Sequence, residues 1–303
     1  MLLNIQNETS RLKAVILGTA TSNGPTPKVE ECYDPKSVEN VIAGTYPLEK
    51  DMVKEMDAFE NVLKKYGVQV FRPAIIEGVN QIFARDIGFV IEDKFIQSNI
   101  LPNRINEIGA ISDVYDQINP EKRIIPPPEV HVEGGDVMPW NDYIFVGMYS
   151  GDDYADYITA RTNVQAVTFL QKLFPHKTVK AFELRKSNTN AKENALHLDC
   201  CFQPVGTDKA ILHRNGFLKE EDYQFLLTYF GPENVFEITK DEMYNMNSNI
   251  FSITENVVVS EQGFTRLNTW LRGHGFVVEE IPYAEIGKQE GLLRCSTLPL
   301  IRA

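Results

Sequence analysis

Residues 219–261, KEEDYQFLLTYFGPENVFEITKDEMYNMNSNIFSITENVVVSE, contain the pattern that decides the fold. From 219 to 230 the apolar residues recur at helical spacing, and the run NVFEIT that begins at 234 is typical of a strand. The segment SNIFSITENVVVSE then has two β-rich runs joined by a tight polar turn, which predicts a hairpin. This stretch therefore predicts one unit of helix, strand and β-hairpin.

The same unit recurs along the chain. Helical patterns at 47–67, 154–174 and 264–275 each lead directly into a strand-like run. Further hairpins are predicted for DIGFVIEDKFIQSN, HVEGGDVMPWNDYIFVGMY and HLDCCFQPVGTDKAILHR, and a last copy begins at LLRCSTLPLIR and runs out at the end of the chain. No clear helix precedes the HVEGGD hairpin. Such repetition predicts an α/β fold built from pseudo-symmetric units.

The sequence shows no boundary between domains. No stretch rich in proline, glycine or serine divides the repeats, although IIPPPEV around 126–128 is a rigid connector. Hydrophobic residues make up 43% and charged residues 24% of the 303 positions, so the chain can form a large core and has no polar tract that would stay unfolded. We expect a single domain over residues 1–303.

The net charge and the cysteine content indicate which partners and which cellular compartment to expect. A net charge of −12 repels phosphate backbones and anionic lipids, so we expect neither nucleic acid nor a membrane as partner. A cationic substrate is favoured, although acidity also serves solubility. The start MLLNIQNETSRLK lacks the pattern of a secretion signal, and no apolar run of 18 residues follows. Four cysteines without CxxC spacing predict neither a zinc ribbon nor a disulfide framework, which favours the cytoplasm.

Polar residues of chemical interest stand at the same place in each unit, where the hairpin begins. If the units surround a pseudo-symmetry axis, equivalent positions converge at its centre, and one pocket collects a residue from every unit. The residues at these positions are Asp86, Glu133, His197 with Asp199, Asn247 and Cys295.

Two of these motifs have a specific structural expectation. His197 and Asp199 are two positions apart in a predicted strand, which would place both side chains on one face. Glu133 precedes Gly134 and Gly135, and paired glycines are expected where the backbone bulges or closely approaches another group. A structural histidine in a hairpin and ordinary turn chemistry are the plainer alternatives.

Cys295 is a candidate nucleophile, because a thiolate is favoured next to a positive charge such as a protonated histidine or a bound cation. The alternative is a small buried hydrophobic residue, and Asp86 in FARD could equally form an ordinary ion pair with Arg85. Cys200 and Cys201 are expected to pack in a hairpin strand. The combination of thiol, imidazole and carboxylates at equivalent points of one repeat favours catalysis.

The motifs FARD, HVEGGD, HLDCCF, MNSNIF and RCSTLPL occur in this order. Their combination resembles the guanidino-group-modifying superfamily of arginine deiminases, dimethylargininases and amidinotransferases, and the resemblance covers nearly the whole chain. It implies the pentein fold, an α/β propeller of five repeats around the substrate. This expectation agrees with the repeat pattern found from the residues themselves.

The resemblance also implies roles for individual residues. Cys295 corresponds to the nucleophile, His197 to the general acid and base, and Glu133 to the carboxylate partner of the reaction centre, close enough to hydrogen-bond to His197 or to the substrate. Asp86 and Asp199 correspond to the pair that grips the guanidinium with charge-assisted hydrogen bonds. Arg214, near the end of the HLD hairpin, is a candidate to bind a substrate carboxylate, or else an exposed hairpin arginine. Neither a metal nor an organic cofactor is required.

Several functions stay open at this point. The main hypothesis is a hydrolase acting on arginine or a substituted arginine, since the ending RCSTLPLIR is more similar to the deiminases. An amidinotransferase that passes the amidino group to an amine is the nearest rival. A non-catalytic binding module of the same fold, a thiol protease and a redox sensor are further alternatives. The oligomeric state is also open, with a homodimer as one candidate.

Overall fold

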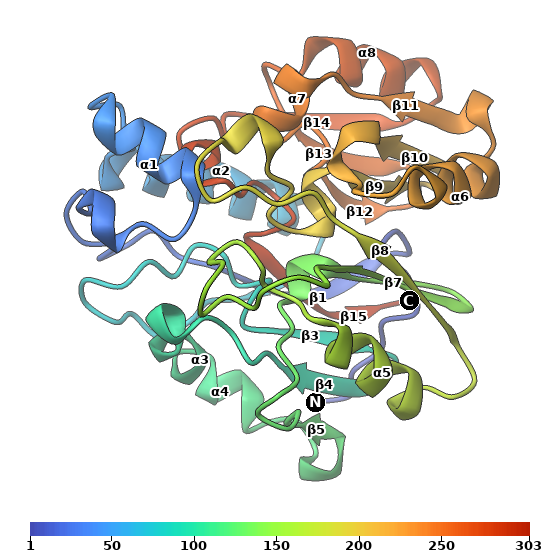
Figure 1. The fold of residues 1–303 in the computed structure, drawn as a ribbon, viewed down its shortest axis with the longest axis horizontal. Helices are drawn as coiled ribbons and strands as arrows, with labels where there is room; N and C mark the ends of the chain where they lie inside the picture. Colours follow the sequence, from blue (N-terminus) through green and yellow to red (C-terminus); the bar gives the residue numbers. More distant parts are fainter.

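Five three-stranded sheets follow one another along the chain in the computed structural model, which describes all 303 residues (Figure 1). In each sheet an antiparallel pair of strands is extended by a third strand that runs parallel to the middle one. The sheets comprise β15 (Thr297–Arg302), β1 (Leu12–Leu17) and β2 (Gln69–Phe71); β3 (Gly88–Ile91), β4 (Lys94–Gln97) and β5 (Arg123–Ile124); β6 (Val137–Trp140), β7 (Tyr143–Met148) and β8 (Thr178–Glu183); β9 (Phe202–Val205), β10 (Lys209–Leu212) and β11 (Val235–Glu237); and β12 (Phe251–Thr254), β13 (Val257–Glu261) and β14 (Val277–Ile281).

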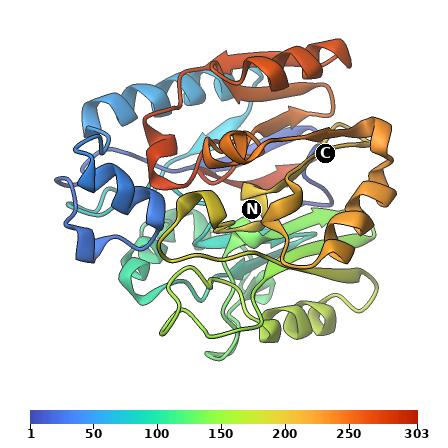
Figure 2. The ribbon, with the colours of Figure 1, turned by 45° about the horizontal axis from the view of Figure 1, so that its top comes forward.

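Helices connect the middle strand of each sheet to its parallel third strand, because two parallel neighbours need a crossover. The crossover helices are α2 (Glu49–Lys65), α5 (Val164–Leu173), α6 (Glu220–Phe230) and α8 (Thr265–Gly273). They lie at the edge of the molecule, around the strands, in the view of Figure 2, whereas Figure 1 shows α2 behind the other elements. The second sheet has only the single-turn helices α3 (Asn106–Gly109) and α4 (Ser112–Tyr115), which explains why no helical pattern precedes HVEGGD.

The first and last strands close the ring of sheets. β15 at the end of the chain pairs antiparallel with β1, in a register that runs from Leu12 opposite Arg302 to Leu17 opposite Thr297. The incomplete last hairpin of the sequence therefore finds its partner strand at the start of the chain. This closure confirms the predicted α/β propeller of five pseudo-symmetric repeats.

The core is formed by the apolar faces of these elements. In α2, Met52, Met56, Phe59 and Leu63 are buried at helical spacing, and the Phe59 ring packs edge-on against Phe251 at 5.7 Å. Fully burying each such side chain contributes about 1.5–3 kcal/mol. No helix combines the length and the apolar character that crossing a membrane requires.

Two sequence predictions about secondary structure were wrong. The segment HLDCC is no strand but contains a 3₁₀ turn, η6 (Leu198–Cys200), so His197 and Asp199 do not share a strand face. The helix expected from 154 begins only at Val164, because the Asn163 side chain accepts a hydrogen bond from the backbone N–H of Ala166 and caps it there. Two further helices, α1 (Pro35–Ile42) and α7 (Lys240–Tyr244), were not predicted.

Candidate active site

The predicted polar residues lie in short turns directly before the first strand of a sheet. Asp86 precedes β3, Glu133 precedes β6, His197 and Asp199 precede β9, and Cys295 precedes β15. None of the five is more than 3% exposed. The propeller thus brings them together from four of its five repeats, as the symmetry argument predicted.

The two glycines after Glu133 permit this convergence. A Cβ on Gly134 would lie 2.1 Å from the carbonyl oxygen of Arg85, and a Cβ on Gly135 would lie 2.7 Å from the His197 ring. Both contacts are too short for any larger residue. The glycine pair therefore serves close approach between repeats, which is the role predicted from the sequence.

One half of the site carries acid and base groups. Nε2 of His197 lies 2.7 Å from Oε2 of Glu133, and its Nδ1 lies 3.8 Å from Oδ1 of Asp86. Burial opposes protonation of His197, but the charges of Asp86 and Glu133 outweigh it and raise the pKa of this histidine. Burial likewise opposes ionisation of Glu133, yet Arg161 and His197 hold its pKa below the usual range. Both shifts favour an imidazolium beside a carboxylate.

Two arginines that the sequence analysis missed neutralise this half. Nη1 of Arg161 lies 3.1 Å from Oε2 of Glu133, and Nη1 of Arg104 lies 2.7 Å from Oδ2 of Asp86. Both guanidinium groups lie 5.7 Å from the centre of the Tyr33 ring. No local motif marks these arginines. The only signal was indirect, since buried carboxylates require a cationic partner.

The other half carries the thiol. Sγ of Cys295 lies 3.5 Å from Oδ2 of Asp199 and 3.1 Å from Nδ2 of Asn249, whose Oδ1 accepts the backbone N–H of Cys295. Burial raises the pKa of the Cys295 thiol well above its ordinary value, and the charges of Asp199 and Asp86 add to the effect. The charge of Arg294 acts in the opposite direction but more weakly, so this environment favours the neutral thiol.

The repeat that contains β12 contributes Asn249 to the site, and not Asn247, which was predicted from the sequence. Asn247, which the sequence analysis placed at this position, is buried but makes no contact with Cys295 and lines a different cavity. The discrepancy of two residues arises because the turn before β12 continues to Ile250. The amide that contacts the thiol is therefore the one nearer the strand.

Arg294 holds the thiol half of the site in position through several hydrogen bonds. Its guanidinium donates to Oδ2 of Asp199 at 2.8 Å, to both carboxylate oxygens of Glu8 at 3.1 and 3.2 Å, and to the backbone carbonyls of Gly135 and Val137. The side chain is fully buried. Burial opposes its charge, but Glu8 and Asp199 outweigh this and raise the pKa of Arg294. The residue next to Cys295 is thus locked by several repeats at once.

Arg214 does not join the cluster. Its side chain is 54% exposed and forms a two-pronged ion pair with Glu220 at 2.9 and 2.7 Å. It follows β10, whose last residue Leu212 pairs with Phe202 at the start of β9, so Arg214 lies at the same end of the hairpin as the site but its side chain lies in solvent. The structure therefore agrees with the second interpretation of Arg214, an exposed hairpin arginine. Cys200 and Cys201 are buried, as expected for packing residues, although they lie in and after η6 and not in a strand.

Donor atoms of Asp86, Glu133 and His197 lie within 4.8 Å of one another, which is close enough to consider a metal ion. Most of these atoms are already committed, because Oε2 of Glu133 contacts both His197 and Arg161 and Oδ2 of Asp86 contacts Arg104. Only Oδ1 of Asp86 lacks a hydrogen-bond partner. A divalent cation would have to displace bound guanidinium groups, so the donor set fits a metal poorly.

A cavity of about 400 Å³ borders the acid–base half. Arg104 and Phe83, which both contact Asp86, form part of its wall. The segment around Tyr33 and Asp34, just before α1, lies on its other side. The candidate site is therefore closed in this structure, with one cavity leading up to Arg104.

Comparisons with known proteins agree with this geometry. The family model for N,N dimethylarginine dimethylhydrolase, eukaryotic, matches residues 47–302. The uncharacterized protein YkgA of Bacillus subtilis (strain 168) is 30% identical over 243 residues, which are 79% of this chain and 77% of that protein. Among solved structures, the N-terminal domain of ArgZ, a cyanobacterial arginine dihydrolase, has a TM-score of 0.77 at 16% identity over 95% of this chain and 98% of that one. The amidinotransferase SxtG from Microseira wollei has a TM-score of 0.77 at 17% identity over 99% and 97%.

The fold and the family match define a pentein of the guanidino-group-modifying superfamily. Within this superfamily, the chain belongs to the N,N-dimethylarginine dimethylhydrolase family. The two solved structures share less than a fifth of their residues with it and support the fold alone.

Proposed function

We propose that this protein hydrolyses the guanidino group of arginine or of an arginine methylated on that group, with Cys295 as covalent nucleophile. The observation that carries the proposal is one buried cluster in which a thiol, an imidazole and three carboxylates from distant segments contact one another or shared partners. Membership of the dimethylarginine dimethylhydrolase family supports the choice of a guanidino substrate. Residues 1–303 act together as one catalytic domain in this proposal.

Asp86 and Asp199 supply the grip on the substrate guanidinium. Oδ1 of Asp86 is buried without a hydrogen-bond partner, and Oδ1 of Asp199 has only a contact of 4.0 Å with the Cys200 thiol. A planar cation with several N–H groups can satisfy both oxygens and orient its central carbon toward sulfur. The unsatisfied carboxylate oxygen is thus explained as a place kept for the substrate.

The bound cation also activates the nucleophile. A positive charge beside Cys295 offsets the burial and the carboxylate charges that raise the pKa of this thiol, and Asn249 donates a hydrogen bond that stabilises the thiolate. As the cation binds, the thiol releases its proton to solvent. The thiolate then attacks the guanidino carbon and a carbon–sulfur bond forms. Substrate binding and thiol ionisation are coupled in this scheme.

His197 moves the protons. As the tetrahedral adduct collapses, the carbon–nitrogen bond to the leaving amine breaks and the imidazolium of His197 donates its proton to that nitrogen. Neutral His197 then removes a proton from water, which attacks the amidino thioether carbon. Collapse of the second adduct releases a ureido product and the Cys295 thiolate. Glu133 holds the imidazole and stabilises its charged form.

A product assay tests the proposal. The protein is incubated with N,N-dimethylarginine, arginine and agmatine, with and without glycine as amine acceptor, and products are measured by mass spectrometry. We expect a ureido product and a free amine whose formation does not depend on glycine. Transfer of the amidino group to glycine would identify an amidinotransferase instead. Absence of turnover with every guanidine would indicate a non-catalytic module.

A further inference from the structure

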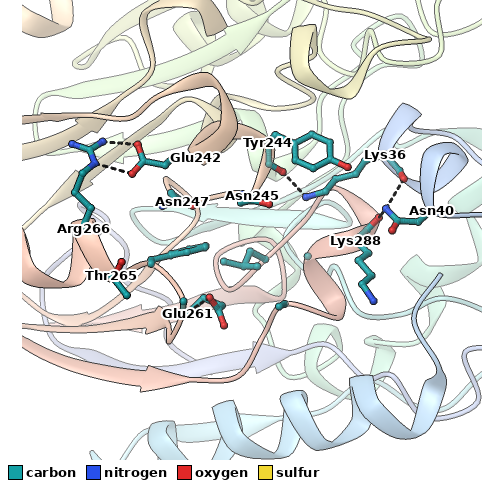
Figure 3. A pocket seen from close by; sticks show the side chains of 15 residues that line it. Lys36, Asn40, Glu242, Tyr244, Asn245, Asn247, Glu261, Thr265, Arg266 and Lys288 are labelled. Atoms are coloured by element: carbon teal, nitrogen blue, oxygen red, sulfur yellow. Dashed lines mark hydrogen bonds and ion pairs between the residues drawn. The ribbon is translucent and has the colours of Figure 1, made fainter. Parts of the chain in front are cut away.

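A second cavity, of about 500 Å³, lies outside the catalytic cluster (Figure 3). Its wall is formed by α1, the segment from α7 to Asn247, the turn between β13 and α8, and the 3₁₀ helix η9 (Ile286–Gln289) with the residues around it. The volume falls in the range of sites that hold small molecules. None of the five candidate catalytic and guanidinium-binding residues lines it.

The cations around this cavity already have partners. Arg266 forms a two-pronged ion pair with Glu242 at 2.8 and 2.5 Å, and Lys288 lies 2.7 Å from Glu285. Lys36 donates to the carbonyl oxygen of Tyr244, as Figure 3 shows. The charges of Arg266 and Lys288 are thus paired with carboxylates, whereas the Lys36 ammonium group is held at a backbone carbonyl on the α1 side of the cavity.

Glu261 differs from the other charged groups in the wall. It is 6% exposed and no lysine, arginine or histidine lies within ion-pair distance of it. The N–H of Gly263 donates to its Oε2 at 2.6 Å, and a Cβ on Gly263 would lie 2.7 Å from that oxygen. The turn thus fixes a carboxyl group at the cavity that has backbone N–H partners but no cation, and burial raises its pKa. A cationic ligand would stabilise its ionised form.

Two further groups complement this carboxylate. Asn247 is 4% exposed, lines the cavity, and its side-chain amide makes no hydrogen bond within the protein. Phe264, 6% exposed, adds an aromatic surface to the same wall. A buried carboxylate, a free amide and an aromatic ring are the groups that recognise an organic cation with a short apolar chain.

We propose that this second cavity binds a small organic cation, an alkylammonium or alkylguanidinium ion, and that the bound cation stabilises α1, which forms part of the same wall. The cationic group pairs with Glu261 and Asn247, and the chain packs on Phe264. Binding at this site does not require the hydrolysis proposed above.

The effect on α1 follows from walls that the two cavities share. In α1, Lys36 and Asn40 line the second cavity, whereas Ser37 lines the cavity that leads to Arg104. In η9, Lys288 lines the second cavity and Gln289 the first. Nδ2 of Asn40 donates to the carbonyl oxygen of Lys288 at 3.3 Å, so α1 and η9 form a common partition. A ligand that fills the second cavity therefore stabilises this partition, and α1 with it.

Calorimetric titration with 1,5-diaminopentane, which has no guanidino carbon, tests the binding site. The titration is done at pH 8, because burial raises the pKa of Glu261 and its carboxylate must be ionised. We expect one diamine per chain in the wild type, at least tenfold weaker binding in Glu261→Gln, and unchanged binding in the active-site variant Asp86→Asn. Pentan-1-ol, the uncharged control, should not bind.

A second variant tests the binding site independently of whether Glu261→Gln folds. Thr265 is exposed at the first turn of α8 and lines the cavity, so Thr265→Trp should fill the cavity, keep the fold and abolish diamine binding. Equal affinity of wild type and Glu261→Gln, or loss of binding in Asp86→Asn, would overturn the site.

Hydrogen exchange tests the coupling to α1. Saturating diamine should slow amide exchange in Pro35–Ile42 of the wild type and leave it unchanged in Glu261→Gln. Binding to the wild type without any change of exchange in this helix would overturn the proposed coupling.

Discussion

The thiol half of the candidate active site is fixed by a fully buried guanidinium, whereas the acid–base half borders a cavity and keeps a carboxylate oxygen without a partner. Arg294 satisfies Asp199, Glu8 and two backbone carbonyls at once. Arg104, by contrast, lines the cavity, and Oδ1 of the neighbouring Asp86 has no hydrogen bond. We infer that the nucleophile is positioned before substrate arrives, and that substrate completes the other half.

The largest effect is expected for the nucleophile itself. Cys295→Ser should lower kcat/KM by about 10³-fold or more, because an alcohol at neutral pH is far less ionised than a thiol. Steady-state kinetics on N,N-dimethylarginine measure this. Cys201→Ser is the matched control, since that buried thiol contacts only the carbonyl of Leu198, and it should keep near wild-type activity. Full activity of Cys295→Ser would remove this residue from the mechanism.

Replacement of Arg294 should destabilise the thiol half of the candidate active site. Arg294→Met leaves Glu8 and Asp199 buried without their cation, so the free energy of unfolding should fall by about 3–5 kcal/mol. Urea unfolding measures the loss. Arg214→Met removes an exposed ion pair with Glu220 and should change stability by less than about 1 kcal/mol. Similar losses in both variants would contradict the distinction between the buried network and the surface pair.

Asp86→Asn should act mainly on binding. With catalysis blocked by Cys295→Ser, the additional change should weaken substrate binding by about 2–5 kcal/mol, because the guanidinium loses a buried charge partner. Calorimetry gives the affinity directly. Asp199→Asn should weaken binding and also lower stability, since Arg294 depends on that carboxylate. Unchanged affinity in both variants would rule out the proposed grip.

The smallest effect is expected for Glu133→Gln, in the pH dependence of kcat/KM. The carboxylate of Glu133 helps to raise the pKa of His197, so its removal lets the imidazolium lose its proton at lower pH. The high-pH limb of the profile should move toward lower pH, and activity at neutral pH should fall by about tenfold. A limb that stays in place or moves upward would exclude Glu133 as the partner of His197.

Much of the fold could be predicted from the sequence because its signals are local. A hairpin such as 248–261 has period-two runs and a polar turn within a few residues, and the α2 stripe lies within one helix. The single-turn helices α3 and α4 were missed because four residues are too few to establish a helical period. The short turn η6 was read as a strand for the same reason.

The convergence of the candidate site residues could be predicted for some of them and not for others, for similar reasons. The hairpin starts identified Asp86, Glu133, His197, Asp199 and Cys295, because symmetry converts a position in a repeat into a position in space. Arg104 and Arg161 were not found, since they lie in the crossovers of the second and third sheets, Arg104 in the short 3₁₀ helix η2 (Pro102–Arg104) and Arg161 in an irregular stretch before α5. Their role depends on long-range ion pairing, which leaves no local pattern in a single sequence.

The central claim is that Cys295 bonds to the guanidino carbon and that the amine leaves first. Rapid acid quench during turnover of N,N-dimethylarginine, followed by peptide mass spectrometry, tests it most directly. We expect an adduct on the peptide that contains Cys295. Its mass should equal that of the substrate without dimethylamine, so that the amino-acid portion is retained. An adduct that carries the amidino group alone would contradict hydrolysis in favour of transfer, and turnover without any adduct on Cys295 would contradict covalent catalysis at this residue.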